Sequence, residues 1–294
     1  MLGRQPRRAG QRARRRGVQG FQRSARSTHL RFLPRASGTS WLREQRRRHF
    51  HYHDPDGLAV DASGNLYVVD FRNERVQVYA APYHGSPTTL VDPGQMPLGV
   101  AVDRLGTVAV ANIFSTAGQP SISFYAKGAT SPTNTVSNAA FAEIYLDAFD
   151  ARGNLYLDGI DSGDNTLLGV VWGGIKGKAI KILTTANTIS FPGAVQVTTR
   201  GLIAIEDLSG PTIYTYNPPN RKTRSLGKPV ATTPLSGSGD FAFKRGNAFV
   251  LVVNGYDDSV DEYAYPAGGS RVKTFRLPPG TSPVDMAVYP PEIP

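Results

Sequence analysis

The chain has 294 residues, no cysteine and a formal net charge of +10. The length fits one large all-β domain or two smaller ones, and the lack of cysteine excludes disulfides and thiolate chemistry. No apolar run of about 18 residues occurs, which excludes a membrane-spanning helix.

The charge is unevenly distributed along the chain. Residues 1–50 hold 15 Arg, no Lys and one acid, Glu44, a balance of +14. Residues 51–294 hold 18 basic and 22 acidic residues, a balance of −4. The basic character therefore belongs to the N-terminal segment, and the remaining chain is mildly acidic.

Residues 1–52 have neither helical nor strand periodicity, which predicts a disordered Arg-rich tail. Three other interpretations stay open: a basic arm that binds nucleic-acid phosphates, a transit-type targeting segment, and an N-terminus outside the native reading frame. Arginine without lysine is unusual for a phosphate-binding arm, because lysine serves there almost as well. Nucleic acid is expected as a partner only if this segment belongs to the native protein.

The stretch "DASGNLYVVD" at 61–70 predicts the end of one strand, a tight turn and the start of another. Near-copies of it recur down the chain. Their turn glycines lie 42, 47, 48 and 45 residues apart, at Gly64, Gly106, Gly153, Gly201 and Gly246. Glycine suits a short hairpin turn because it adopts positive φ without steric strain. A fixed period of this size indicates a repeat architecture.

Each repeat predicts four short strands with period-2 patterning, typical of the blades of an all-β propeller. The third strand ends on an aromatic residue in every unit: Tyr79, Tyr125, Trp172, Tyr216 and Tyr265. We expect these rings to pack between blades; a ligand cage is the alternative.

Five full antiparallel blades are predicted within a domain at 53–294. Their approximate ranges are 55–96, 97–140, 141–189, 190–236 and 237–279. A partial repeat at 280–294, with "PVDMAVYP", predicts the innermost strand of a sixth blade. The expected fold is thus a six-bladed propeller with an incomplete sixth blade.

The stretch "PDGLAVDASGNLYVVDFRNERVQVYA" resembles the NHL-repeat propellers and related bacterial propellers of the gluconolactonase-like and streptogramin-lyase-like kinds. The resemblance covers about 55–294. It implies a six-bladed ring with an axial funnel and an extracytoplasmic location, and we expect a monomer.

An acid or amide ends the second strand of every unit, where the loops face the expected funnel. These residues could together bind a divalent cation such as Ca²⁺: Asp70, Asn112, Asp158, Asp207 and Asn254. The alternative is that Asp and Asn end strands because their side chains bond nearby backbone. The acid-rich "DSGDN" at 161–165 lacks EF-hand spacing and predicts a solvated turn.

The enzymes of the resemblance match poorly. The first repeat lacks the metal-ligating Glu that gluconolactonase-type propellers place there, and Asn112 and Asp207 fit the other ligand positions loosely. Lyases on this fold depend on histidines, whereas the chain after residue 53 has one, His84. No G-x-S-x-G elbow occurs.

The sequence therefore favours a non-catalytic binding or scaffold protein. It would hold an unknown protein or small-molecule ligand at the funnel or on its loop faces. A metal-dependent lactonase is the first alternative, and nucleic-acid binding through the Arg-rich arm is the second.

Overall fold

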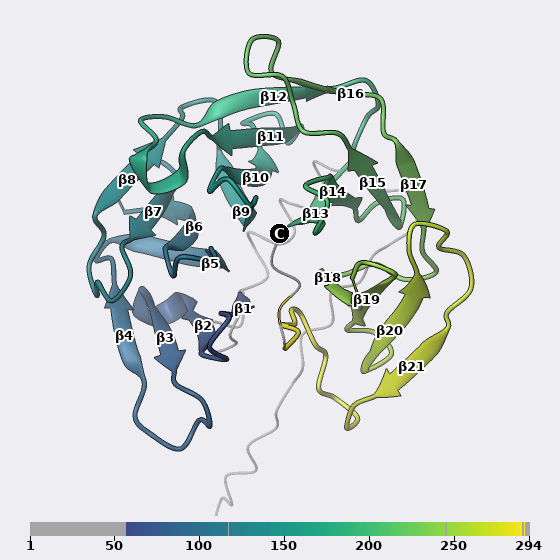
Figure 1. Cartoon of the computed structure of the whole chain (residues 1–294), viewed down its shortest axis with the longest axis horizontal. Helices are drawn as coiled ribbons and strands as arrows, with labels where there is room; N and C mark the ends of the chain where they lie inside the picture. Colours follow the sequence, from purple (N-terminus) through teal and green to yellow (C-terminus); the bar gives the residue numbers. More distant parts are fainter. Residues whose placement is uncertain (1–56, 117, 245, 290, 292–294) are drawn as a thin grey trace, which may run out of the picture.

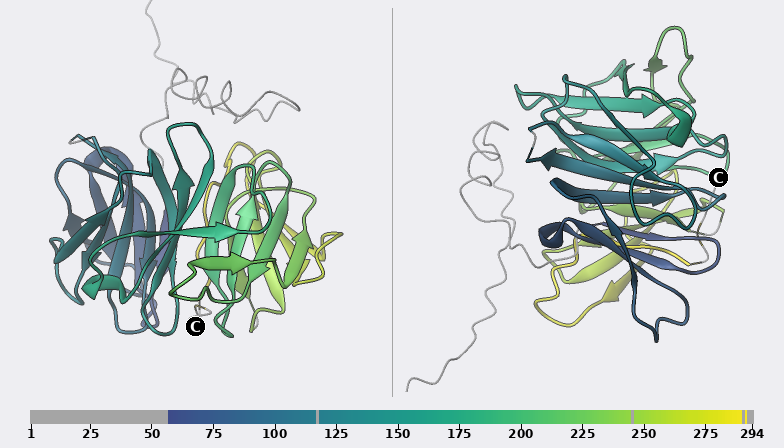
Figure 2. Two further views of the ribbon diagram at one scale, coloured as in Figure 1. Left: turned by 90° about the horizontal axis from the view of Figure 1, so that it is seen from above. Right: turned by 90° about the vertical axis from the view of Figure 1, so that its left-hand side faces the viewer.

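The structure, a computed structural model, describes residues 57–116, 118–244, 246–289 and 291. These form an all-β propeller of five antiparallel sheets around a common axis (Figures 1 and 2). The predictions made for residues 1–52 lie outside the described residues. No helix in the described part of the chain is long and apolar enough to cross a membrane.

Four consecutive strands build each of the first three blades, numbered along the chain. Blade 1 contains β1 (Leu58–Val60), β2 (Leu66–Asp70), β3 (Arg75–Tyr79) and β4 (Thr88–Val91). Blade 2 contains β5 (Gln95–Val102), β6 (Val108–Ser115), β7 (Ser121–Tyr125) and β8 (Asn134–Ser137). Blade 3 contains β9 (Glu143–Phe149), β10 (Leu155–Ile160), β11 (Thr166–Val171) and β12 (Lys181–Thr185). Two short 3₁₀ turns, η1 (Phe71–Asn73) and η2 (Gly174–Lys176), follow β2 and β11.

The last two blades also contain four strands each, but an additional strand interrupts blade 4 in sequence and joins the sheet of blade 3. Blade 4 contains β13 (Pro192–Val197), β14 (Ile203–Asp207), β15 (Thr212–Tyr216) and β17 (Ala231–Pro234). Between β15 and β17 the chain makes an excursion whose strand β16 (Ser225–Gly227) pairs in parallel with β12 of blade 3. Blade 5 contains β18 (Phe241–Lys244), β19 (Phe249–Asn254), β20 (Ser259–Ala264) and β21 (Lys273–Arg276).

The recurring turn has a local physical cause. In blade 1, Asp61 Oδ1 accepts hydrogen bonds from the backbone N–H groups of Ser63 and Asn65, and Gly64 has φ +83°. The Asp side chain therefore replaces backbone partners inside the turn, while glycine supplies the positive φ. Asp103 and Asp150 make the same bonds in blades 2 and 3. We call the end of the propeller that carries these turns the turn face.

The core lies between blades. Each of four apolar clusters combines side chains from two adjacent sheets. The expected packing of the repeated aromatics between blades is confirmed for Tyr125, Tyr216 and Tyr265. Tyr125 joins the cluster with blade 1, and Tyr216 the cluster with blade 3. Tyr265 packs against the blade 4–5 cluster. Burying a large side chain of this kind contributes about 1.5–3 kcal/mol.

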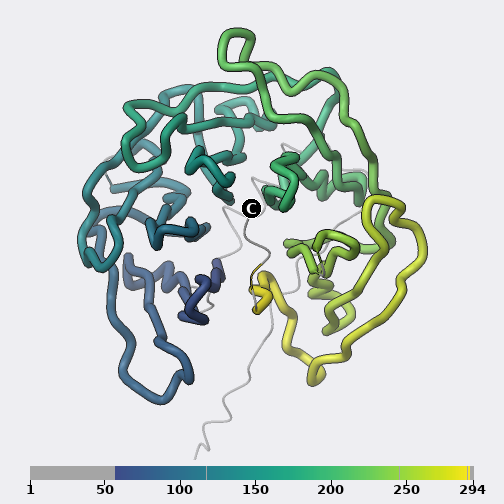
Figure 3. The backbone as a smooth tube through the Cα atoms, viewed as in Figure 1, coloured from purple at the N-terminus to yellow at the C-terminus, as the bar shows by residue number. Residues whose placement is uncertain are grey.

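The expectation of a six-bladed ring is wrong, because the described residues form five blades. A sixth blade needs at least a hairpin partner for its innermost strand, and residues 277–289 provide one extended segment that pairs with no strand of the described residues. Figure 3 shows this C-terminal segment running to the propeller axis between β1 and β18.

The C-terminal segment bridges blades 5 and 1. Asp258 in the β19–β20 loop accepts hydrogen bonds from the N–H groups of Gly280 and Ser282. Asp285 accepts one from Leu58 N at the start of β1. A single segment thus links the first and last blades.

Candidate functional site

Two of the five predicted strand-end residues are occupied by local partners. Asp70 forms an ion pair with Arg75 at 2.8 Å and accepts hydrogen bonds from the Asn73 amide. The Asn112 amide donates to the hydroxyls of Ser121 and Ser123 within its own blade. These contacts give both side chains a structural role, Asp70 at the end of β2 and Asn112 within β6, which continues to Ser115.

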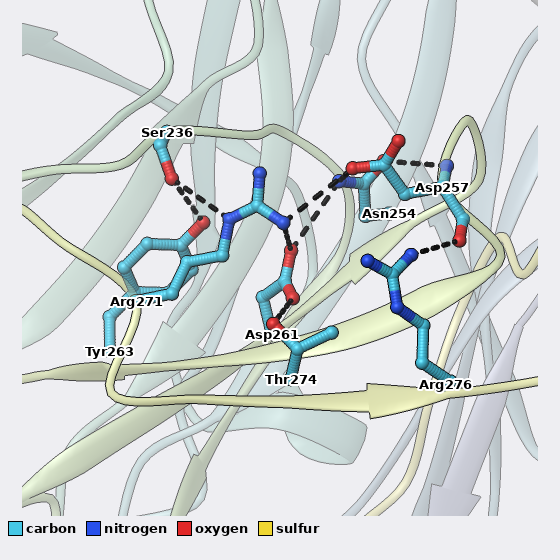
Figure 4. Close-up of polar contacts among 8 residues, drawn as sticks. All are labelled: Ser236, Asn254, Asp257, Asp261, Tyr263, Arg271, Thr274 and Arg276. Atoms are coloured by element: carbon cyan, nitrogen blue, oxygen red, sulfur yellow. Dashed lines mark hydrogen bonds and ion pairs between the residues drawn. The ribbon is translucent and has the colours of Figure 1, made fainter.

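Asp207 and Asn254 also bond their own surroundings. Asp207 accepts hydrogen bonds from the N–H groups of Ser190 and Ser209, which flank its hairpin. The Asn254 amide donates to Asp257 at 3.1 Å, within the polar network of blade 5 in Figure 4. Arg271 lies at the centre of that network and pairs with the buried Asp261 at 3.2 Å. The joint use of the five strand-end residues as a metal site stays a prediction.

Asp158 differs from the other four in its hydrogen bond, because its carboxyl accepts from the backbone of the innermost strand of its own blade. It is fully buried on β10. Its Oδ1 accepts a hydrogen bond from Leu146 N at 3.0 Å, across an irregularity in the β9–β10 pairing, and its Oδ2 has no partner. Burial raises the pKa of Asp158 well above its usual range, although the Leu146 bond opposes this.

Glu206 on β14 occupies the equivalent position in blade 4 and is also fully buried. Its Oε1 accepts from Gly239 N at 3.3 Å, and its Oε2 has no partner. Burial raises the pKa of Glu206 well above its usual range, with Asp240 and Asp207 adding to the rise. The sequence prediction chose the neighbouring Asp207 and missed Glu206. The equivalent positions of β2 and β6 hold the apolar residues Val69 and Ala111. An acid at a repeat position that is apolar in other blades is the signal that could have identified Glu206.

Asp240 and Asp285 form a carboxyl pair beside these residues. Burial raises the pKa of both groups, and the carboxylate of Asp240 raises that of Asp285 further. The hydrogen bond between the two carboxyls raises the pKa of Asp285 and lowers that of Asp240, as expected where Asp285 is the donor. Sequence reasoning missed both, because the partner of Asp240 comes from the C-terminal segment and no strand pattern predicts that contact.

A cavity of about 200 Å³ opens beside the pair, at the end opposite the turn face. Asp240 lies in its wall. Its apolar lining comes from blades 3, 4 and 5 and from the C-terminal segment: Leu146, Leu208, Val253, Tyr256, Pro283 and Val284. We call this cavity with Asp158, Glu206, Asp240 and Asp285 the axial acidic pocket. Asp158 and Glu206 lie directly behind its lining, because they bond the backbone of Leu146 and Gly239.

A second cavity of about 140 Å³ lies on the axis toward the turn face, lined by the innermost strands of all five blades. Asp147 of β9 lines it, and neither carboxyl oxygen has a partner. Burial raises the pKa of Asp147 well above its usual range, with a smaller contribution from Asp158.

The electrostatics of the axial acidic pocket favour a positively charged guest. An isolated buried carboxylate is unfavourable, so these groups hold protons that they would not hold in water. A cation in the cavity would stabilise the ionised forms and displace those protons. Among the described residues, no set of three or more His, Asp and Glu side chains is arranged to hold a metal ion.

The remaining predicted features lie away from this pocket. His84 is exposed in the loop after β3. The "DSGDN" segment is a turn as expected: Asp161 accepts hydrogen bonds from Gly163 N and Asn165 N. The "GGIKGK" segment at 173–178 contains η2 and joins β11 to β12.

An NHL-repeat family model matches residues 52–79, the part of the chain with the first complete repeat turn. The chain is a β-propeller whose residues 52–79 are similar to an NHL repeat. No curated protein matches it by sequence.

Solved structures share this fold at low sequence identity. A chain from the nidogen/laminin complex is 18% identical with a TM-score of 0.58, over 78% of this chain and 82% of that chain. Virginiamycin B lyase from Staphylococcus aureus is 13% identical with a TM-score of 0.57, over 81% and 74%. A luciferin-regenerating enzyme is 15% identical with a TM-score of 0.55, over 77% of each chain. Enzymes and a protein complex therefore both use this fold, which alone does not assign a role.

Proposed function

We propose that this propeller is a non-catalytic binding protein that holds a small cationic ligand in the axial acidic pocket. The observation that carries the proposal is an apolar cavity with Asp240 in its wall, whose lining residues Leu146 and Gly239 donate backbone hydrogen bonds to the buried carboxyls of Asp158 and Glu206. Apolar pockets with a few convergent polar groups and perturbed pKa values are typical ligand sites.

The dimensions and lining define the ligand further. About 200 Å³ is below the 300–1,000 Å³ typical of pockets for drug-sized molecules, so the ligand is small. Six apolar side chains would surround its body, while Asp240 would receive an ammonium or similar N–H donor. A short alkylammonium ion combines these two properties.

The chemistry needed for lyase activity is not gathered at the pocket. A histidine-to-alanine variant of the staphylococcal lyase is described as catalytically inactive. In the described part of the present chain, the sole histidine, His84, is exposed on a blade 1 loop. Burial raises the pKa of the carboxyls that do converge, and a bound cation would stabilise their ionised forms.

The test uses n-butylammonium as the probe and 1-butanol as its neutral isostere, with binding followed by saturation-transfer NMR. Wild-type protein should bind the ammonium ion and not the alcohol. Binding should tighten as the pH rises from about 5 to 8, because ligand entry displaces protons from carboxyls with raised pKa values. Asp240→Asn should weaken binding about tenfold or more, since it removes a charged hydrogen-bond partner.

Asp164→Asn is the matched control, because Asp164 lies in the β10–β11 turn outside the pocket and its φ of +62° suits asparagine. Equal affinity for the two isosteres, or unchanged binding by Asp240→Asn, would contradict the proposal. CaCl₂ in place of the amine tests the alternative. Stoichiometric Ca²⁺ binding that Asp240→Asn abolishes would support the metal-dependent hydrolase instead.

A further inference from the structure

The propeller carries a second feature, which the axial pocket does not use: its charges are distributed unevenly along the chain. Residues 165–239 contain eight Lys and Arg and two acids, Glu206 and Asp207. Both acids are buried, so the surface of this segment carries positive charge. The other described residues hold nine basic and seventeen acidic residues. The basic character of the fold is therefore concentrated on the outer part of blades 3 and 4.

The blade 4 excursion, residues 217–230, concentrates this charge further. Figure 1 shows the excursion projecting beyond the ring, followed by β16, which pairs with β12 of blade 3. Thr184 N donates to Arg224 O, and Ala186 N donates to Gly227 O, which fixes the excursion on blade 3. The sequence "NRKTRSLGK" of the excursion thereby joins the lysines of "KGKAIK" at 176–181 on one rim. We call the two segments, 172–181 and 220–228, the basic rim.

An aromatic platform lies within the basic rim. The guanidinium carbon of Arg221 lies 4.9 Å from the ring centroid of Trp172, and Trp172 meets Tyr156 edge-on at 6.4 Å. Gly173 N donates to Asn154 Oδ1, which brings the exposed Arg152 of the neighbouring turn to the same place. Arg221 is exposed and Trp172 is half-buried. One face of the Arg221 guanidinium therefore packs on the Trp172 ring, and its other face is open to solvent.

The described residues form no ion pair with the cations of the basic rim, and the nearby carboxylate of Asp150 is bonded to Asn154 and Tyr156. No ion pair joins Lys176, Lys178, Arg221, Lys222 or Arg224 to a carboxylate of a described residue. Lys176 and Lys178 extend from a turn whose carbonyl groups bond the Asn134 amide of blade 2, so their backbone is held in place. A fixed array of unpaired cations is suited to a polyanion.

We propose that the basic rim binds single-stranded nucleic acid. Its lysines would neutralise successive phosphates, and an unstacked base would lie on the Arg221 guanidinium supported by Trp172. An acidic peptide would need apolar anchors, and the exposed residues between Asn217 and Lys228 are polar, charged or proline. This site is separate from the axial acidic pocket and does not depend on what that pocket binds.

The experiment must separate the basic rim from the Arg-rich residues 1–50, and the chain allows this. It contains two tryptophans, Trp41 and Trp172. In the full-length Trp41→Phe variant, Trp172 is therefore the sole tryptophan and reports on the rim alone. Titration with a 12-nucleotide oligouridylate should quench Trp172 fluorescence in a saturable manner, while fluorescence anisotropy of a labelled oligonucleotide reports total binding.

A triple variant then tests the cations. This variant combines, in the Trp41→Phe background, the substitutions Arg221→Ser, Lys222→Ser and Lys178→Ser. It should bind the oligonucleotide about tenfold more weakly at 0.1 M salt, as reported by Trp172 fluorescence. The substitutions should also lower the slope of log K against log[salt] by about 2, since each lost contact to a single strand contributes about 0.7. The matched control replaces three exposed cations elsewhere: Arg104→Ser, Lys127→Ser and Lys273→Ser.

Two further arms distinguish the ligand classes. Arg221→Lys keeps the charge but removes the planar group, so it should weaken binding of the oligonucleotide and leave binding of inorganic polyphosphate unchanged. Oligonucleotide binding seen by anisotropy without any change at Trp172, with equal affinity in both triple variants, would place binding outside the rim and overturn the proposal. Equal competition by polyphosphate or polyglutamate at matched charge would overturn it in favour of a general polyanion.

Discussion

Replacing Asp147 by valine should stabilise the folded protein, because its carboxyl group is buried without a partner. The four equivalent positions on the other innermost strands, given by the strand registers, are apolar: Leu58, Val100, Val195 and Ala242. A buried polar group without a partner costs about 1–3 kcal/mol. The expected gain in the free energy of unfolding is of that size, or a rise of about 2–8 °C in Tm.

The pH dependence separates this cause from improved packing. The folded pKa of Asp147 is raised, so the unfolded chain releases its proton near pH 4 while the folded protein keeps it. The wild-type group therefore destabilises the fold increasingly as the pH rises above about 4. Scanning calorimetry should show a larger gain for Asp147→Val at pH 7.5 than at pH 4.5. Destabilisation, or an equal gain at both pH values, would refute the reasoning, and Asp147→Asn controls for the lost charge without added apolar volume.

Three other changes have directions fixed by the structure. Arg271→Met should lower the free energy of unfolding, measured in urea, by about 2 kcal/mol, because it leaves the buried Asp261 without its cation. The guanidinium is partly exposed, so the loss is smaller than for a fully buried ion pair. Gly159→Ala should destabilise by about 1–3 kcal/mol, since its Cβ would lie 2.1 Å from a β9 carbonyl oxygen, whereas Gly85→Ala meets nothing within 4 Å and should be neutral. The raised pKa values of the axial carboxyls predict that Tm falls as the pH rises from about 4 to 8. Asp285→Asn should make this fall of Tm with pH less steep. An unchanged slope would contradict the coupling between the carboxyls of Asp240 and Asp285.

The repeated elements of the fold could be predicted from the sequence because their causes are local. An Asp, a Gly at positive φ and alternating apolar residues define each hairpin, and all of them lie within about ten residues. The blade count could not be derived in this way. "PVDMAVYP" has the pattern of an innermost strand, but its state depends on whether partner strands exist elsewhere in the chain. Pattern alone cannot distinguish a strand from an extended segment held by Asp258 and Leu58 N.

The candidate site was predicted in part, for a related reason. Strand-end acids were chosen because the position repeats in every blade, and most of them turned out to bond their own turns, as Asp70 and Asp207 do. Gly159 shows the limit of the repeat. It takes the strand-end position in blade 3, where no Cβ fits, and the acid lies one residue earlier at Asp158. That shift brings its carboxyl to the backbone N–H of Leu146 on the innermost strand β9.

Residues that depart from the repeat are therefore better candidates for functional residues than those that recur in every blade. A residue type that recurs at the same position of every blade has a structural role common to all blades: it forms a turn, packs between blades or ends a strand. Asp158 and Glu206 stand where blades 1 and 2 have Val69 and Ala111, and each leaves a buried oxygen unpartnered. The β16 excursion occurs in one blade and brings Arg221 onto Trp172. Both departures place ionisable groups where the other blades have none, and a bound ligand of opposite charge would balance each of them.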